Sequence, residues 1–329
     1  MKLVYIAMLV GLAAPLHAAD PLEQARAAAL TQPAESIALF EAQLGDFEQT
    51  PAWYQRDWLV LAARAYTRLK QFPQAEQRLR QADTLLSQGL GKTDLLLTAG
   101  FVNLMQQKYQ AAFYWYQCSA QFDLPPTEQA RVVMSLGQIA YLQQDFQQAG
   151  LHFQTSLDIA RQYQLKSLQA LLQNNLGLVL WRQQQHAAAI RLLKQAMYGY
   201  TQLQEQYSLQ MVSLNLLTVV VSQQDWPTYD RYVGRIANSI KAGAPADLKH
   251  YLALLQALRH LGKPQQQPDL SQLTQLAKRF EIPGLVQNAS WLLQPYGIIA
   301  PTFERPLAPM HDLRMPQLEQ SCGAYAARP

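Results

Sequence analysis

The sequence predicts an all-α protein built from stacked helical hairpins, and three observations carry this prediction. One pattern recurs along the chain, in which a small residue is followed twelve positions later by an alanine. The pairs are Ala63 with Ala75, Gly100 with Ala112, Gly137 with Ala149, and Gly177 with Ala189. Their first members lie 37, 37 and 40 residues apart. No stretch of any length alternates apolar and polar residues as a half-buried strand does.

Each unit has the pattern of a helix, a short polar turn and a second helix. Small residues at the two recurring positions let the helices of one hairpin approach closely. Apolar residues such as Leu136, Phe153 and Leu193 fall on faces that pack against neighbouring helices. Glutamine runs close the first helix of successive units, at 106–107, 143–144, 183–185 and 223–224. Glutamine is polar and favours helices, so these runs are interpreted as exposed turns.

These units resemble the tetratricopeptide repeat, although they are longer than its usual form of about 34 residues. The resemblance implies a right-handed α-solenoid in which the first helix of each hairpin lines a concave surface. It also implies that the chain works by binding a protein or a peptide on that surface, without covalent chemistry.

The expected elements follow one another from the N-terminus. Residues 19–45 form a helical cap with short helices at 22–30 and 34–44, because the end of a solenoid lacks a neighbour on one face. Residues 46–294 form the solenoid of about six hairpins, which are expected at 51–88, 92–123, 126–163, 166–203, 207–241 and 248–280. The sixth hairpin carries an inserted loop at 264–268, and a short helix at 285–293 closes the stack.

Two parts of the chain depart from the repeat. The fifth hairpin places Leu217 and Tyr229 at the two small positions, so its helices are expected to pack more loosely. Residues 295–329 are predicted to form a proline-rich, extended C-terminal tail, since proline interrupts any helical pattern there. The prolines concerned are Pro301, Pro306, Pro309 and Pro316.

The first residues have the pattern of a secretory signal peptide. A lysine at position 2 precedes an apolar run from Leu3 to Leu16, and small residues follow it. We therefore expect residues 1–18 to be removed after Ala18, or one residue later. An uncleaved membrane anchor is the alternative, but the run is shorter than the roughly 20 residues that span a bilayer. No cysteine follows the run, so lipid attachment is not indicated, and a periplasmic location is expected.

Composition gives no support to two classes of partner. The chain has 27 lysine and arginine residues against 23 aspartate and glutamate residues, a net charge of +4 that falls to +3 without Lys2. This excess is too small to indicate nucleic-acid binding or attachment to a membrane surface.

Catalytic signatures are missing from the sequence. Gly91-Lys92-Thr93 copies the end of a phosphate-binding loop, but Leu86 stands where the first glycine belongs. The histidines after residue 18 show no ligand-like spacing with one another or with carboxylates. We therefore expect no enzymatic activity, no metal site and no cofactor. Asn288-Ala289-Ser290 matches a glycosylation sequon, but it lies within an expected helix.

The candidate binding residues come from the resemblance, which carries ligand contacts onto the first helix of each hairpin. A concave groove is thus expected from Arg64, Arg68, Phe101, Arg131, Gln138, Tyr141, Asn174, Asn175, Trp181, Arg182 and Asn215. Four arginines on one face favour an acidic side chain or a terminal carboxylate as ligand. The aromatic residues serve either packing or binding.

Asn175 and Asn215 occupy the same register one repeat apart. Asparagines facing an open groove are able to bond the N–H and C=O groups of an extended peptide. Alternatively, the pair reflects residual repeat similarity or bonds adjacent helices to each other. If the asparagines bind a peptide, replacing them should change the stability of the fold little. If they bond adjacent helices to each other, replacing them should lower the stability.

Three functional hypotheses follow. The first is an exported adaptor or scaffold that binds a protein or an extended peptide in the groove. The second is a periplasmic receptor for a small ligand, such as a short peptide or a cell-wall fragment, that signals to a membrane partner. The third is the helical part of an enzyme whose catalytic part is another chain.

Two cysteines remain after export. Cys118 lies near the middle of a second helix, outside the positions that usually face the core, and Cys322 lies in the predicted tail. An oxidising compartment permits a disulfide between them, which would hold the tail against the outer face of the solenoid.

Overall fold

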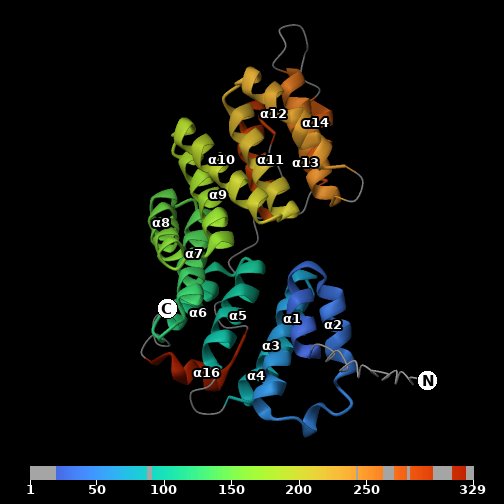
Figure 1. Cartoon of the computed structure of the whole chain (residues 1–329), viewed down its shortest axis with the longest axis vertical. Helices are drawn as coiled ribbons and strands as arrows, with labels where there is room; N and C mark the ends of the chain where they lie inside the picture. The colour runs from blue at the N-terminus through green and yellow to red at the C-terminus, as the bar shows by residue number, and fades with distance from the viewer. Residues whose placement is uncertain are drawn as a thin grey trace, which may run out of the picture. The chain divides into compact units, whose positions relative to one another are not determined.

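The computed structural model describes residues 20–86, 91–241, 244–261, 270–279, 282–298 and 313–323. The prediction of an all-α fold of stacked helix pairs is confirmed, because every regular element in these residues is an α-helix or a 3-10 helix. The chain divides into two compact units (Figure 1). Unit 1 comprises Met1–Thr98 and Leu313–Ser321, and unit 2 comprises Ala99–Asp312 and Cys322–Pro329. The predicted signal peptide, 1–18, and the loop at 264–268 lie outside the described residues.

Unit 1 begins with two short helices that pack on the first full hairpin. Asp20 caps the first of them by accepting a hydrogen bond from the backbone N–H of Leu22 at 3.1 Å. Phe40, Trp58 and Leu79 are completely buried and form the centre of this unit's core. Its elements are α1 (Pro21–Thr31), α2 (Pro33–Ala42), η1 (Phe47–Gln49), α3 (Ala52–Arg68), α4 (Phe72–Thr84), the start of α5 (Lys92–Met105) and α16 (Pro316–Ser321).

Helix α16 corrects the prediction of an extended tail. Pro316 stands at the first position of this helix, where the missing N–H costs nothing, so the proline starts a helix here instead of breaking one. Asp83 of α4 accepts hydrogen bonds from the backbone N–H groups of Gln317 and Leu318, at 3.2 and 2.8 Å. A carboxylate from a distant part of the sequence thus caps α16. The other prolines of the predicted tail lie outside the described residues.

Unit 2 contains the regular part of the solenoid. From α7 to α11 each helix has 17 residues and is joined to the next by a connection of three residues. Its elements are the end of α5, α6 (Tyr109–Ser119), α7 (Pro126–Leu142), α8 (Phe146–Gln162), α9 (Lys166–Arg182), α10 (His186–Gln202), α11 (Gln206–Ser222), α12 (Trp226–Ser239), α13 (Ala246–Leu261), α14 (Leu270–Ala277), α15 (Pro283–Leu293) and η2 (Gln294–Tyr296).

Glutamine supplies the left-handed residue in six of the seven connections described next. The turns share one residue in the left-handed region, with φ between 55 and 64°, at Lys70, Gln107, Gln144, Gln164, Gln184, Gln204 and Gln224. In each turn the next N–H bonds back to a carbonyl of the finished helix, as from Asp145 to Ala140 at 2.9 Å. This is the Schellman pattern, which satisfies carbonyls that the helix end leaves unpaired. Identical turns keep successive hairpins in the same register.

Glycines in the first helices fit side chains of the second helices. A Cβ atom added to Gly137 would lie 2.8 Å from the Phe153 ring, and one added to Gly177 would lie 2.8 Å from Cγ of Leu193. Both partner side chains are buried. The recurring small positions therefore exist because a side chain from the paired helix occupies the space.

The fifth hairpin has large residues at the two positions that are small in the other hairpins. Leu217 and Tyr229, its residues at the small positions, are both buried, yet α11 and α12 contact each other less extensively than α9 and α10 do. Helix α11 also packs against α13 and α15 and is buried along most of its length. The two helices of the fifth hairpin thus contact each other less, and α11 is buried by contacts with several other helices instead.

Cys118 and Cys322 form a disulfide in unit 2, with their Cα atoms 5.3 Å apart. Both residues are buried, although the sequence placed Cys118 outside the core-facing positions of its helix. The bond joins α6 to the residue that follows α16.

The close approach at Gly177 has a measurable consequence. We expect Gly177→Ala to lower the free energy of unfolding by about 1–3 kcal/mol, because Leu193 must move into an already filled core. This cost outweighs the helix-propensity gain of roughly 1 kcal/mol. Gly234→Ala is the matched control, since this exposed helical glycine has no atom within 4 Å of an added Cβ. Urea denaturation of both variants is the measurement, and equal stabilisation by both would contradict the packing argument.

Burial raises the pKa of Asp83 above its ordinary value near 3.8, although its two N–H donors act in the opposite direction. The folded protein therefore holds a proton at pH values where the unfolded chain has lost it. Folding takes up a proton in this range, so the free energy of unfolding falls as the pH rises from 3.8 through the raised pKa. Asp83→Asn keeps a hydrogen-bond acceptor without the charge, so we expect its free energy of unfolding to lack this fall with pH. Denaturation curves of both proteins across this pH range are the measurement. If the wild type became more stable relative to Asp83→Asn as the pH rose, the argument would be contradicted.

A candidate ligand pocket in unit 2

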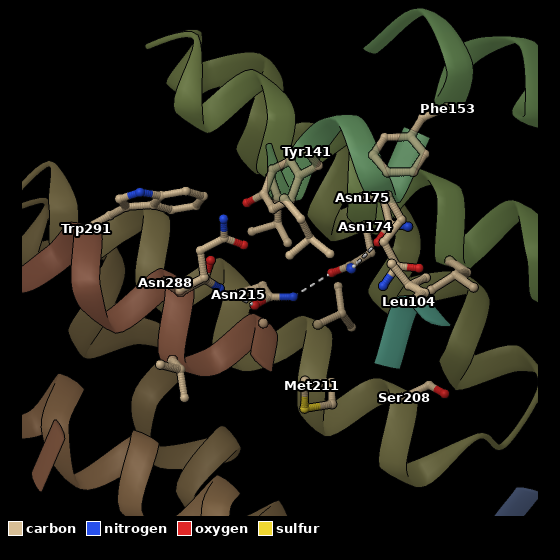
Figure 2. Close-up of a pocket in the computed structure, with 18 of the residues that line it drawn as sticks. Leu104, Tyr141, Phe153, Asn174, Asn175, Ser208, Met211, Asn215, Asn288 and Trp291 are labelled. Atoms are coloured by element: carbon tan, nitrogen blue, oxygen red, sulfur yellow. Dashed lines mark hydrogen bonds between the residues drawn. The ribbon is translucent and has the colours of Figure 1, made fainter. Parts of the chain in front are cut away.

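Unit 2 contains a pocket of about 610 Å³. Its walls come mainly from the end of α5 and the start of α6, and from α7, α9 and α11, which are the first helices of three successive hairpins. Phe153 of α8 and Tyr200 of α10 also reach it, and a further wall is α15, from a later part of the sequence (Figure 2). The volume is within the range of about 300–1,000 Å³ that is usual for small-ligand sites.

Helix α15 is held against the repeats by an aromatic cluster around Trp291. The Trp291 ring makes edge-on contacts with Tyr141, Phe146 and Trp181, with ring centres 5.7, 5.9 and 5.7 Å away. The Arg182 guanidinium lies 3.5 Å above the centre of the Trp291 ring, a close cation–π contact. The expected helix at 285–293 therefore does more than close the stack, because it also packs onto α7, α8 and α9.

A chain of asparagine amides crosses the pocket wall. Asn288 donates to Asn215 at 3.1 Å, Asn215 donates to Asn174 at 2.8 Å, and Asn174 donates to Asn175 at 3.1 Å (Figure 2). Asn288 and Asn215 are buried, with 2% and 3% of their surface exposed, whereas Asn174 and Asn175 are half-buried. The amides join α15, α11 and α9.

This chain decides between the two readings of the asparagine pair. Asn215 does not face an open groove, because both its amide nitrogen and its amide oxygen are bonded to side chains of other helices. The prediction that it binds a peptide backbone is wrong for the folded state described, and the helix-bridging alternative applies. Asn175 is the last residue of the chain of amides. Its amide oxygen accepts from Asn174, and its own amide nitrogen remains available to the pocket.

Two further polar groups of the pocket have no hydrogen-bond partner in the described part of the chain. They are the hydroxyl of Tyr141 and Oε1 of Gln287, and both atoms are buried. Burial raises the pKa of Tyr141 far above its ordinary value, since the phenolate would be poorly solvated there. The hydroxyl is therefore neutral and serves as a donor or an acceptor.

The pocket contains only part of the predicted groove. The predicted residues that line it are Gln138, Tyr141, Asn174, Asn175 and Asn215. Trp181 is instead buried with its indole N–H bonded to Ser222 at 2.8 Å, and Phe101 is half-buried outside the lining. For Trp181 the packing alternative applies.

The four predicted arginines do not line the pocket. Arg64 belongs to unit 1, where it pairs with Asp94 at 2.9 Å and donates to Thr98. Arg68, also in unit 1, and Arg131, in unit 2, are exposed, and neither lines the pocket. Arg182 is engaged by the aromatic cluster, and burial lowers its pKa. Helical register alone does not show which neighbour each side chain meets. The sequence therefore could not show that these four arginines lie in different surroundings.

Residues of α15 are the functional candidates that sequence reasoning missed. Val286, Gln287, Asn288 and Trp291 all line the pocket, yet the sequence assigned this helix only to the end of the stack. A signal was present, since Asn288 stands in an otherwise largely apolar helix, and a buried amide needs a polar partner.

Within the described residues, no group of three histidine, cysteine, aspartate or glutamate side chains is placed to hold a metal ion. Among those same residues, no helix is long and apolar enough to cross a membrane. The lining of the pocket also includes no histidine, carboxylate, lysine or cysteine among its described residues.

Residues 128–202, which cover most of α7 to α10, match the tetratricopeptide repeat family. This segment consists of tetratricopeptide repeats. No curated protein sequence matches the chain significantly. The tetratricopeptide repeats supply two of the helices that line the pocket, α7 and α9.

Solved structures show the same fold at low sequence identity. Aspartyl phosphate phosphatase F from Bacillus subtilis matches with a TM-score of 0.61 and 12% identity, over 88% of this chain and 81% of that chain. The Rap conjugation gene regulator of plasmid pLS20, in complex with the Phr* peptide, gives 0.56 and 13%, over 92% and 93%. The apo form of RapI gives 0.56 and 15%, over 74% and 84%. At these identities the likeness concerns the fold alone.

The amide chain predicts unequal effects on stability. We expect Asn215→Leu to lower the free energy of unfolding by about 1–3 kcal/mol, because it leaves the amides of Asn288 and Asn174 unpaired in a buried place. Asn175→Leu affects only the half-buried end of the chain, so a loss below about 1 kcal/mol is expected. Chemical denaturation of the two variants compares them directly. Equal losses would show that the chain does not join the helices as described.

Proposed function

We propose that this protein is an exported, non-enzymatic receptor that binds a short peptide in the pocket of unit 2. The observation that carries the proposal is a pocket whose lining offers amide groups to a ligand. Asn175 offers an amide N–H without a partner, and Gln138 adds a second side-chain amide to the same lining. A peptide group presents one C=O acceptor and one N–H donor, which these groups complement.

The position of α15 favours a short ligand over a long one. This helix covers part of the surface formed by α7, α9 and α11, where an adaptor would lay an extended peptide. The free space that remains is a bounded pocket, so the receptor hypothesis is better supported than the adaptor hypothesis. No covalent step belongs to the proposal, because the described lining lacks a nucleophile paired with a base.

Fold similarity supports the proposal by analogy. A structural relative with a TM-score of 0.56 was solved in complex with a peptide, the Phr* peptide. Solenoids of this kind generally bind partners on their concave surfaces. Function depends on the site and not on the fold, so the residues of this pocket carry the argument and the relative adds to it.

A ligand in this pocket would touch α15 and the repeats together. Six residues of α15 line the space, including Gln287, Asn288 and Trp291. Binding would therefore strengthen the attachment of α15 to α7, α9 and α11, and this coupling offers a route for passing a signal to a membrane partner.

Export rests on the N-terminal sequence. We expect the protein produced with its own leader to begin at Ala19 or Asp20 and to fractionate with soluble periplasmic contents. Intact-mass analysis of the exported protein measures the N-terminus. Recovery of a membrane-bound form that retains residues 1–18 would refute export through a cleaved signal.

Peptide binding is tested with the mature protein and a mixed pool of short synthetic peptides of four or five residues. Affinity selection followed by mass spectrometry identifies retained peptides, and calorimetry measures them individually. We expect Asn175→Leu to weaken binding about 5- to 100-fold, because a ligand carbonyl loses its donor. Gln129→Ala, at an exposed position of α7 away from the pocket, is the matched control. The proposal fails if no peptide is retained, or if both variants bind like the wild type.

A further inference from the structure

The pocket is electrically neutral over its described lining. It contains no aspartate, glutamate, lysine, arginine or histidine side chain among the described residues, and its polar groups are amides and hydroxyls. The nearby cation of Arg182 is stacked on Trp291 and does not belong to the lining. Resting on the proposed function, we propose that the pocket selects an uncharged peptide segment with aliphatic side chains, and excludes charged side chains and free termini.

Charge exclusion follows from the cost of burial. A charged group enters a buried site at acceptable cost only when an opposite charge or several aligned hydrogen bonds replace its water. The described lining provides no opposite charge for either sign. A cationic ligand group is the less favourable of the two, because Arg182 stands behind Trp291 without an ion-pair partner in the described part of the chain.

The apolar part of the wall selects the side chains. Leu104, Met105, Leu171, Leu178, Met211 and Val286 all contribute to it. Aliphatic side chains bury favourably against such a surface. Its apolar part therefore favours a ligand with aliphatic side chains over a ligand that carries hydroxyl groups at most positions.

The polar part of the wall orients the peptide backbone. All three hydrogen bonds of the amide chain run in the same direction, from Asn288 through Asn215 and Asn174 to Asn175. The chain therefore ends in a donor at Asn175, and bonds in series polarise one another. The Asn175 amide N–H therefore offers a neutral donor to a peptide C=O, without any need for a charge.

The test uses the full mature protein and a pool of N-acetylated, C-amidated peptides of four or five residues. Their positions are randomised among alanine, leucine, valine, serine, phenylalanine, aspartate and lysine. The same pool with free termini is selected in parallel, and mass spectrometry compares each retained set with its input. We expect aspartate and lysine to be depleted at least about tenfold among retained blocked peptides, lysine more strongly. Peptides with free termini are expected to bind at least about tenfold more weakly than their blocked forms.

The outcomes separate the two proposals. Retention of blocked aliphatic peptides with loss of charged ones supports neutral selection, provided that Asn175→Leu abolishes the enrichment and Gln129→Ala does not. Equal or preferred retention of aspartate-containing, lysine-containing or free-terminus peptides overturns neutral selection and leaves peptide binding in place. Retention of no peptide from either pool overturns both. A neutral oligosaccharide included as a competitor should displace nothing, and full displacement by it would also overturn the peptide assignment.

Discussion

The hydrogen bonds of Asn215 join the three helices α9, α11 and α15 around the pocket of unit 2. A buried amide that loses its partner costs free energy comparable to a lost hydrogen bond, and Asn215 has partners on two other helices. Its oxygen accepts from α15 and its nitrogen donates to α9, so the position of α15 is set by polar groups that must be paired. The aromatic cluster around Trp291 adds apolar contact area to the same docking. Without α15 in this place, the pocket would be an open surface.

The repeat itself makes this arrangement possible. Helices of 17 residues joined by three-residue turns return each first helix to the same orientation after 40 residues. Asn174 and Asn175 on α9, and Asn215 on α11, are thereby brought to one face. The glycines at 137 and 177 let paired helices approach closely enough for this register to be kept. Local turn chemistry and close packing therefore act together on the geometry of the site.

The neutrality of the pocket contrasts with two arginines of the helices that line it. Arg131 of α7 is exposed, and Arg182 of α9 is stacked on aromatic rings. Neither cation lines the pocket, because one lies in water and the other lies against an aromatic face. The described lining that remains consists of amide, hydroxyl, aromatic and aliphatic side chains.

The sequence by itself determined the all-α class, the hairpin boundaries and the turns, because these depend on patterns within a few tens of residues. Glycine and alanine at fixed spacing, and glutamine at left-handed turn positions, are local signals. Asn174, Asn175 and Tyr141 were also identified as candidates, through the resemblance to the tetratricopeptide repeat.

Only the tertiary structure decided which partner each side chain meets. Asn288 and Asn215 are 73 residues apart, and Asp83 and Leu318 are separated by 235. Neither pairing leaves a periodic trace in the sequence. The replacement of a fully open groove by a partly covered pocket follows from the docking of α15. That docking depends on the combined burial of Trp291 and pairing of Asn288, which are long-range contacts that no local pattern specifies.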